Sequence, residues 1–341
     1  MSGSSLDGLD LALCEFQLED GCWSYAIENA RTIPYTEAFR ERLRQVMHGK
    51  ALELAELDRD MGDIIGQACR EFLSGKKVDM VASHGHTVFH QPEQGLTLQI
   101  GQGARIAAHT GLPTINDFRS LDVALGGQGA PLVPLGERLL FPGHRTFLNL
   151  GGICNISVHG PDGVLGYDVC IGNQALDHLA RSAGQRYDAN GAMARSGQVD
   201  PEMLKTLDAL PFHQQRPPRS LGREWFNEAV LPLIDNCSMP LNDRLRTTAE
   251  HIARQLSFAL TSVDGPVLVT GGGAHNGFLI ERLRTLTQVA IEVPEHRLVD
   301  FKEALLFALL GVLRMRGEVT ALASVTGASR NSCGGAVHQP N

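Results

Sequence analysis

Two glycine-marked turns in the middle of the chain constrain its fold more than any other feature. Residues 146–173 contain two short apolar runs separated by Gly151-Gly152, and a Pro-Asp-Gly turn at 161–163 leads into a third run. Because glycine accepts positive φ at both turn positions, the pattern predicts a tight hairpin and an antiparallel meander. Such turns can present outward-pointing N–H groups to an anion, although many Gly-Gly hairpins bind nothing. A phosphate site is therefore one of two interpretations.

One carboxylate, Asp168, ends the third predicted strand. Gly172-Asn173 and a helical pattern from Gln174 to Ala183 follow it. A general base must be held close to the group that it deprotonates, and an acid at a strand end beside a phosphate site meets that need. We therefore expect Asp168 to be a catalytic base.

Length and composition exclude several classes of protein. A chain of 341 residues fits two domains, and its net charge of −8 disfavours nucleic acid as a partner. It has no uninterrupted apolar run near about 18 residues and no basic region followed by an apolar one at its start, so we expect a cytoplasmic protein without a membrane partner. The seven scattered cysteines lack a Cys-x-x-Cys pair, which argues against a disulfide framework and a zinc site.

The first third of the chain alternates expected strands and helices. A small-residue turn at the start feeds a hairpin, as the Gly-Gly turn does later, which suggests a duplicated fold. A strand, a helix and a strand between residues 96 and 116 predict a right-handed βαβ unit. The expected strands are 9–16, 22–27, 78–83, 96–100 and 113–116, and the expected helices are 35–49, 51–74 and 104–110.

Three histidines, His84, His86 and His90, follow the strand at 78–83. They could be metal ligands, but no further ligand follows at helical spacing, so contact with a polar ligand is the favoured interpretation. The Gly-rich stretch from Asp122 to Pro134 is too apolar for a flexible linker. It is a domain junction, a loop lining a cleft, or both.

Glycines also separate a buried strand from a helix in the last third of the chain. The strand at 266–270 runs into Gly271-Gly272-Gly273, and this arrangement lets a backbone approach a nucleotide closely. The loop at 216–227 carries three arginines and is either a solvated surface or a clamp for an anion. The tail after residue 329 is expected to be disordered. The remaining expected elements are helices at 174–183, 201–208, 247–262 and 302–315, a helix from Phe278, and a strand at 291–293.

Eight motifs occur in order along nearly the whole chain. They are MSGSSLDG, SHGHT, DFR with GGQGAPLVP, NLGGICN, GYD with GN, GREWFN, TGGGAHN and SVTGA. In this order they resemble the motifs of the anhydro-N-acetylmuramic acid kinases, which belong to the actin, hexokinase and Hsp70-like ATPase superfold.

The resemblance implies an α/β protein of two ribonuclease-H-like (actin-like ATPase) domains with a central cleft. The domains are expected at 1–122, completed by 321–341, and at 123–320. The resemblance also implies ATP and Mg²⁺, small-molecule partners in ATP and an amino sugar, and it leaves room for a homodimer. In the implied reaction, water opens the 1,6-anhydro bridge at C1 while O6 takes the γ-phosphoryl group, giving N-acetylmuramic acid 6-phosphate and ADP.

The same resemblance implies roles for individual residues. Asp168 is the catalytic base, and no residue is assigned to the metal. The sugar side is assigned to His84, Asp117, Arg119 and Asn173. The residues assigned to ATP are Gly3, Ser4, Ser5, Leu6, Asp7, Gly8, Leu9, Asp10, Gly151, Gly152, Asn155, Gly271, Gly272, Gly273 and Asn276.

The sequence departs from the family pattern at four places. It begins at the first turn, where the family has a strand before that turn, and we expect an added apolar strand to raise stability and tighten ATP binding. Ser4 stands in place of Thr, and His86 in place of Gln. Cys170 and Ile171 replace Gly and Pro after Asp168. These departures leave two alternatives open, a related sugar kinase with another acceptor and a nucleotide-binding paralogue without turnover.

Overall fold

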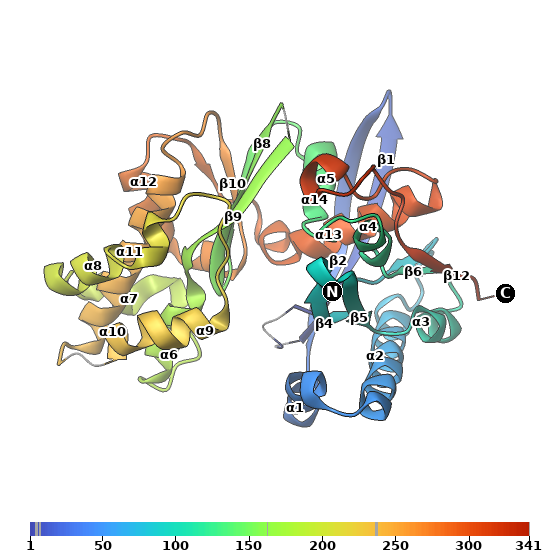
Figure 1. Ribbon diagram of the computed structural model, residues 1–341, viewed down its shortest axis with the longest axis horizontal. Coiled ribbons are helices and arrows are strands. Elements are labelled where there is room, and N and C mark those ends of the chain that lie inside the picture. Colours follow the sequence, from blue (N-terminus) through green and yellow to red (C-terminus); the bar gives the residue numbers. More distant parts are fainter. Residues whose placement is uncertain (4–5, 7, 162, 236–237, 341) are drawn as a thin grey trace. The chain divides into compact units, whose positions relative to one another are not determined.

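The structure is a computed structural model that describes residues 1–3, 6, 8–161, 163–235 and 238–340 (Figure 1). The chain forms two compact units: unit 1 comprises residues 1–142 and 301–341, and unit 2 comprises residues 143–300. The domains expected from the sequence, 1–122 with 321–341 and 123–320, differ from these units at both boundaries and remain a proposal.

The helices and strands of both units are mixed along the chain, which confirms the α/β class. The strands are β1 (Gly8–Glu19), β2 (Cys22–Pro34), β3 (Val81–Ala82), β4 (His86–Gln91), β5 (Leu96–Ile100), β6 (Thr114–Asn116), β7 (Thr146–Leu150), β8 (Ile153–Gly160), β9 (Gly163–Ile171), β10 (Val267–Thr270), β11 (Ile291–Glu292) and β12 (Ala336–His338). The helices are α1 (Glu37–Gln45), α2 (Ala51–Phe72), α3 (Gly103–Thr110), α4 (Ser120–Ala124), α5 (Val133–Leu140), α6 (Asn173–Arg181), α7 (Ala192–Ser196), α8 (Pro201–Asp208), α9 (Arg223–Trp225), α10 (Leu231–Asp235), α11 (Leu241–Ala259), α12 (Gly277–Leu286), α13 (His296–Met315) and α14 (Ala323–Thr326). Shorter turns of helix are η1 (Val46–His48), η2 (Pro92–Gln94), η3 (Ala189–Gly191), η4 (Pro211–Gln214), η5 (Phe226–Val230) and η6 (Gly272–His275).

Unit 2 is built on one mixed sheet in the order β11-β10-β7-β8-β9. The strands β7, β8 and β9 form the antiparallel meander that the sequence predicts, and β10 and β11 continue the sheet in parallel beside β7. The helix α11 packs against α6, α7, α8 and α12 in the helical layer of this unit (Figure 1). Leu148, Val269 and Ile252 are fully buried where sheet and helices meet. Burial of these apolar side chains stabilises the packing of the helices on the sheet of unit 2.

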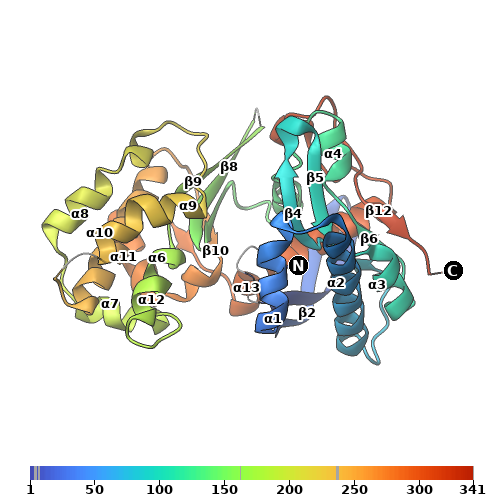
Figure 2. The ribbon, with the colours of Figure 1, turned by 60° about the horizontal axis from the view of Figure 1, so that its bottom comes forward.

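In the described part of unit 1 the strands pair as β1-β2, β12-β6-β3 and β4-β5, and Ser2 forms bridges to Leu9 of β1 and His86 of β4. The helix α2 lies beside α3 and presents Leu57, Met61 and Ile65, four residues apart, to the core (Figure 2). The long helix α13 is interrupted at Phe301, where φ is −119° and ψ is 15°, and this residue begins the C-terminal segment of unit 1. No helix among the described residues is long and apolar enough to cross a membrane.

Two expectations about strand pairing are wrong. The strands β5 and β6 do not form a βαβ unit, because β5 pairs with β4, and the parallel partner of β6 is β3. The tail after residue 329 is ordered at its end, where β12 pairs antiparallel with β6. The side chain of His338 forms a hydrogen bond with Asn116, Nε2 to Oδ1, at 2.9 Å. Pairing between residues so far apart in sequence leaves no local signal.

Candidate active site

The Gly-Gly turn of unit 2 has a different geometry from the one that its sequence predicts. Neither Gly151 nor Gly152 has a positive φ, so the expected left-handed turn is wrong. Their carbonyl oxygens instead accept hydrogen bonds from the N–H groups of Asn173 at 3.0 Å and Gly172 at 2.9 Å. A helix begins with N–H groups that lack partners within the helix. The turn satisfies these groups at the start of α6, which is the physical reason for its shape.

Asp168 lies inside β9 and not at its end, which corrects the prediction of a strand-end carboxylate. The strand continues through Val169, Cys170 and Ile171, which are buried in the core of unit 2. The register between β8 and β9 shifts here: Cys154 pairs with Cys170, but Asn155 pairs with Asp168, so Val169 is an extra residue. Such a β-bulge bends the strand and redirects a side chain. It also places the predicted ATP residue Asn155 opposite Asp168.

The carboxylate of Asp168 is held through one of its two oxygens. Oδ2 accepts hydrogen bonds from the Leu221 N–H at 2.8 Å and from the Ser220 hydroxyl at 3.2 Å. Among the residues that the structure describes, no donor reaches Oδ1. One oxygen is thus fixed by the protein, and the other can accept a proton from a ligand or from water.

The arginine-rich loop at 216–227 is partly explained by this contact. Arg219 donates to the backbone carbonyls of Asp168, Val169, Phe212 and Gln215, so it holds protein backbone and is not an anion clamp. Arg216 is exposed, and the side chain of Arg223 lies outside what the structure describes. The sequence does not mark Ser220 and Leu221 as partners of Asp168, because a polar loop carries no local sign of what it binds.

The three glycines after β10 pack against the end of the neighbouring parallel strand β7. Gly271 has a φ of 85°, and a Cβ on it would lie 3.0 Å from the backbone nitrogen of Leu150. A Cβ on Gly273 would lie 2.8 Å from the Leu150 side chain. The nearest atom to a Cβ on Gly272 would be Nδ2 of Asn173, at 3.7 Å. The fold thus brings Gly151, Asn173 and the 271–273 loop together next to the carboxyl ends of β7 and β10.

Asn276, also assigned to ATP, has a structural partner. Its Oδ1 accepts a hydrogen bond from the Leu279 N–H at 3.0 Å, so the side chain caps the start of α12. An amide that caps a helix satisfies one N–H group that the helix cannot. For a nucleotide Asn276 then has its Nδ2 donors and the second lone pair of Oδ1.

The first turn of unit 1 is described only in part. Ser4, Ser5 and Asp7 lie outside the described residues, and Leu6 has a φ of 56°. A Cβ on Gly8 would lie 2.6 Å from the carbonyl oxygen of Ile33, so only glycine fits there. Leu9 is buried, and the carboxylate of Asp10 accepts the hydroxyl of Thr32 at 2.5 Å. The carbonyl of Gly3 accepts a hydrogen bond from the Leu6 N–H at 3.3 Å.

Half-buried Arg119 and buried His84 form a hydrogen-bonded pair in unit 1. The guanidinium donates to His84 Nε2 from Nε at 3.1 Å and from Nη2 at 2.9 Å, and to the carbonyl of Gly129 at 2.7 Å. Burial and the charge of Arg119 lower the pKa of His84 to about 3, so this imidazole is a neutral acceptor at pH 7. Burial lowers the pKa of Arg119 to about 10, against the opposing charge of Glu303, so the arginine stays charged.

Glu303 was missed by the sequence analysis. Its charge acts on both Arg119 and the amino group of Met1, and it comes from the C-terminal segment that folds back into unit 1. The sequence around Glu303 gives no local sign of which distant residue this carboxylate faces. We add Glu303 to the polar residues around Arg119.

The other two histidines of the predicted cluster have separate partners. His86 is in β4 and forms a hydrogen bond with the Ser2 hydroxyl at 3.1 Å, while His90 pairs with the Thr97 hydroxyl at 3.0 Å. No group of three or more His, Cys, Asp or Glu able to hold a metal occurs in the described part of the chain. The metal-ligand interpretation of His84, His86 and His90 is therefore not supported.

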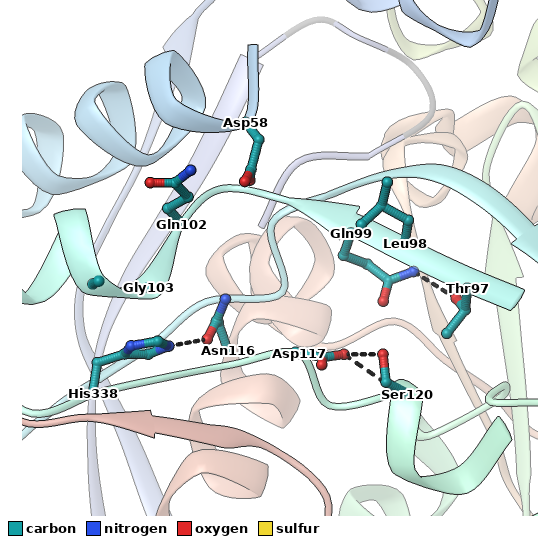
Figure 3. A pocket seen from close by; sticks show the side chains of 11 residues that line it. Asp58, Thr97, Leu98, Gln99, Gln102, Gly103, Asn116, Asp117, Ser120 and His338 are labelled. Carbon is teal, nitrogen blue, oxygen red and sulfur yellow. Dashed lines mark hydrogen bonds between the residues drawn. The ribbon is translucent and has the colours of Figure 1, made fainter. Parts of the chain in front are cut away.

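Asp117 lines a cavity of about 290 Å³ in unit 1 (Figure 3). It has a φ of 53°, and its Oδ1 accepts the Ser120 hydroxyl at 2.6 Å and the Ser120 N–H at 3.3 Å. His84 and Arg119 do not line this cavity, and Asn173 belongs to unit 2. The lining residues are Asp58, Thr97, Leu98, Gln99, Gln102, Gly103, Ala104, Asn116, Asp117, Ser120 and His338.

Gln99 gives the cavity an unsatisfied acceptor. Its Nε2 donates to the Thr97 hydroxyl at 2.9 Å, but its buried Oε1 has no partner among the described residues (Figure 3). A buried polar atom without a partner is unfavourable, and because Gln99 lines the cavity, a turn of its side chain would bring this acceptor to a ligand hydroxyl or amide N–H. No local sequence pattern marks Gln99 as a binding residue.

Comparison with known proteins identifies similar chains. The model of the family "Anhydro-N-acetylmuramic acid kinase" matches residues 1–340. The chain is 36% identical over 369 residues to the anhydro-N-acetylmuramic acid kinase of Gloeobacter violaceus, covering 99% of this chain and 97% of the relative. It is 37% identical over 367 residues to that of Vibrio cholerae, covering 100% and 97%.

Solved structures show a more distant likeness. One is an activator of 2-hydroxyisocaproyl-CoA dehydratase from Clostridium difficile with bound ADPNP, at 17% identity and a TM-score of 0.39 over 66% of this chain and 88% of the other. Another is a ROK family protein from Streptococcus pneumoniae in complex with sucrose, at 14% identity and a TM-score of 0.31 over 86% and 92%.

Proposed function

This chain belongs to the anhydro-N-acetylmuramic acid kinase family, and from that premise we propose how its residues serve the family's reaction. The protein is an ATP-dependent kinase of cell-wall recycling, which opens the anhydro bridge of anhydro-N-acetylmuramic acid and phosphorylates O6. The products are N-acetylmuramic acid 6-phosphate and ADP. The two alternatives, a kinase for another sugar and a paralogue without turnover, are not favoured.

Asp168 is the proposed general base of this reaction. Water loses a proton as its oxygen attacks C1, the bond from C1 to O6 breaks, and O6 attacks the γ-phosphorus while ADP leaves. The observation that supports Asp168 is the asymmetry of its carboxylate, since Oδ2 is held at 2.8 Å by the Leu221 N–H and no described donor reaches Oδ1. A base fixed in this way is already oriented when the substrate binds.

Mg²⁺ is proposed to enter with the nucleotide. Mg²⁺ usually keeps several waters and is held by one or two carboxylates together with substrate phosphates. Asp10 fits this role, because its carboxylate is oriented by the Thr32 hydroxyl at 2.5 Å and it follows the proposed phosphate turn. When bound, the cation would offset charge on the transferring phosphoryl group.

Gly3 to Asp10, the glycines at 151–152 and the glycines at 271–273 are each proposed to contact ATP, and Gly272 offers a test of the last group. We expect Gly272→Ala to leave the melting temperature unchanged, because the nearest protein atom is 3.7 Å from the new Cβ. The affinity for ATP should fall about tenfold or more if the nucleotide packs on that glycine, a loss of about 1.4 kcal/mol. Calorimetric titration with ATP checks this. Gly271→Ala is the comparator, since it should lower stability through its φ of 85°. Unchanged ATP affinity of Gly272→Ala would remove this loop from the nucleotide site.

The sugar is proposed to occupy the cavity lined by Asp117, with Gln99 Oε1 accepting a hydrogen bond from it. Gln99→Met keeps the length of the side chain and removes the acceptor. We expect KM for the sugar to rise about 3- to 10-fold, because one hydrogen bond contributes about 0.5–1.5 kcal/mol. Steady-state kinetics with each substrate varied in turn measures the effect. Gln45→Met, at an exposed glutamine of α1, is the matched control. An unchanged KM for the sugar, or an equal rise in KM for ATP, would contradict the assignment.

The function itself is tested by the acceptor requirement of ADP release. With Mg²⁺ and ATP present, the anhydro sugar should stimulate ADP release, and N-acetylmuramic acid, which has no anhydro bridge, should stimulate it far less. Equal stimulation by the two sugars would support an ordinary sugar kinase. A cytoplasmic location and a homodimer also remain proposals, and sedimentation of the purified protein tests the second.

A further inference from the structure

We propose that Arg219 is a positioning residue, which holds the carboxylate of Asp168 in place through the segment Arg219–Leu221. This inference rests on the proposed role of Asp168. The strand β9 is an edge of the sheet in unit 2, so its outer backbone groups need partners from outside the sheet. The N–H of Asp168 donates to the carbonyl of Arg219 at 3.0 Å. The carbonyl of Arg219 therefore gives the Asp168 N–H, on the outer side of the edge strand β9, a hydrogen-bond partner.

The guanidinium of Arg219 joins the bulge of β9 to η4 and to Gln215, the residue after it. Nε and Nη2 donate to the carbonyls of Asp168 at 3.2 Å and Val169 at 3.3 Å. Nη1 donates to the carbonyls of Phe212 at 3.0 Å and Gln215 at 2.9 Å. The guanidinium carbon also lies 4.6 Å from the centre of the Phe212 ring. A rigid fork with five N–H donors can bridge such separate acceptors, whereas a lysine ammonium is a single point with three.

These bonds matter because of the bulge. Val169 has no partner on β8, so the ladder is interrupted beside Asp168 and fixes the local backbone less firmly. Arg219 holds the backbone at this interruption, because its guanidinium binds the carbonyl of Asp168 and the carbonyl of the bulged Val169. The residues that follow Arg219, Ser220 and Leu221, supply the donors to Oδ2. The direction of the carboxylate thus depends on where Arg219 holds the segment.

Kinetics of Arg219 variants test this inference. We expect Arg219→Met to lower kcat about 10- to 100-fold, since a misplacement of about 1 Å costs up to about 100-fold, with little change in KM for either substrate. Arg219→Lys should lose less, because the ammonium keeps part of the hydrogen bonding. The control is Arg195→Met in the same unit, which removes an arginine paired at 2.7 Å with the Glu281 side chain on the surface. It should keep full activity.

Two further measurements separate positioning from a general loss of structure. Ser220→Ala removes one of the two donors to Asp168 Oδ2 and should lower kcat, by less than Arg219→Met does, without changing KM for either substrate. In the background of Asp168→Asn, Arg219→Met should cause no further loss, because the two residues act as a unit. If Arg219→Met does not fold, Ser220→Ala and Arg219→Lys carry the same test.

The failures are distinguishable. Full kcat in folded Arg219→Met, or losses that multiply in the double variant, would overturn the positioning role and leave Asp168 as the base. Near-normal turnover of Asp168→Asn would instead remove the base on which the inference rests.

Discussion

Replacing Asp168 by Asn is expected to lower kcat by about 10²–10⁴-fold, which is the usual effect of removing a general base. The amide keeps the size of the side chain and can still accept the hydrogen bond from the Leu221 N–H through its oxygen. What it loses is the ability to take a proton from water. The affinity for ATP should change little, because the nucleotide is proposed to lie on backbone at other positions. Single-turnover kinetics together with ATP titration measures both quantities.

A different role for Asp168 would give a different pattern. If the carboxylate mainly oriented Mg²⁺ through water, Asp168→Asn would weaken nucleotide binding, and raised Mg²⁺ would partly restore activity. Repeating the two measurements across a magnesium series separates the roles. Near-normal turnover at every Mg²⁺ concentration would exclude Asp168 from the mechanism and direct attention to Asp10 or Asp117.

Lys302→Met is expected to lower the free energy of unfolding by about 3–5 kcal/mol, because it breaks a buried ion pair by removing one of its members. Lys302 Nζ donates to Glu137 Oε1 at 2.8 Å, and the two side chains are only 8% and 4% exposed. The pair ties α13 to α5 within unit 1. Urea denaturation at neutral pH, followed by circular dichroism, measures the loss.

The double variant Glu137→Leu with Lys302→Met is the control. Replacing both charges by apolar groups of similar volume is often neutral, so most of the lost stability should return. A loss below about 1 kcal/mol in Lys302→Met would indicate a pair that is solvated, as surface ion pairs are.

Local sequence patterns account for much of the fold. The turns at Gly151-Gly152 and at 161–163 predict the meander β7–β9, and apolar residues four apart predict the buried face of α2. These signals are local, because turn chemistry and helical periodicity are properties of neighbouring residues. The glycines after β10 are also a local signal. A run of Gly directly after a strand indicates that the backbone there packs too closely against a neighbouring segment to leave room for a Cβ.

The parts that the sequence could not predict depend on contacts between distant residues. The bulge at Val169 exists only in relation to β8, so the place of Asp168 within the strand could not be read from its neighbours. The strand β12 forms only by pairing with β6, some 220 residues earlier in the chain. Serine and glutamine are common polar residues, so the sequence does not mark Ser220 or Gln99 as part of a site. Ser220 is recognised only by its hydrogen bond to Asp168, and Gln99 only by a buried Oε1 that has no partner among the described residues.

The account depends most on the claim that ring opening by water and phosphorylation occur together on an anhydro sugar. The mass of the product, formed from anhydro-N-acetylmuramic acid and Mg²⁺-ATP in ¹⁸O-labelled water, tests it directly. The account predicts a product that has gained one phosphate and the elements of one water, with the label on C1. A product that has gained phosphate alone, or a sugar that is returned unchanged, would contradict it.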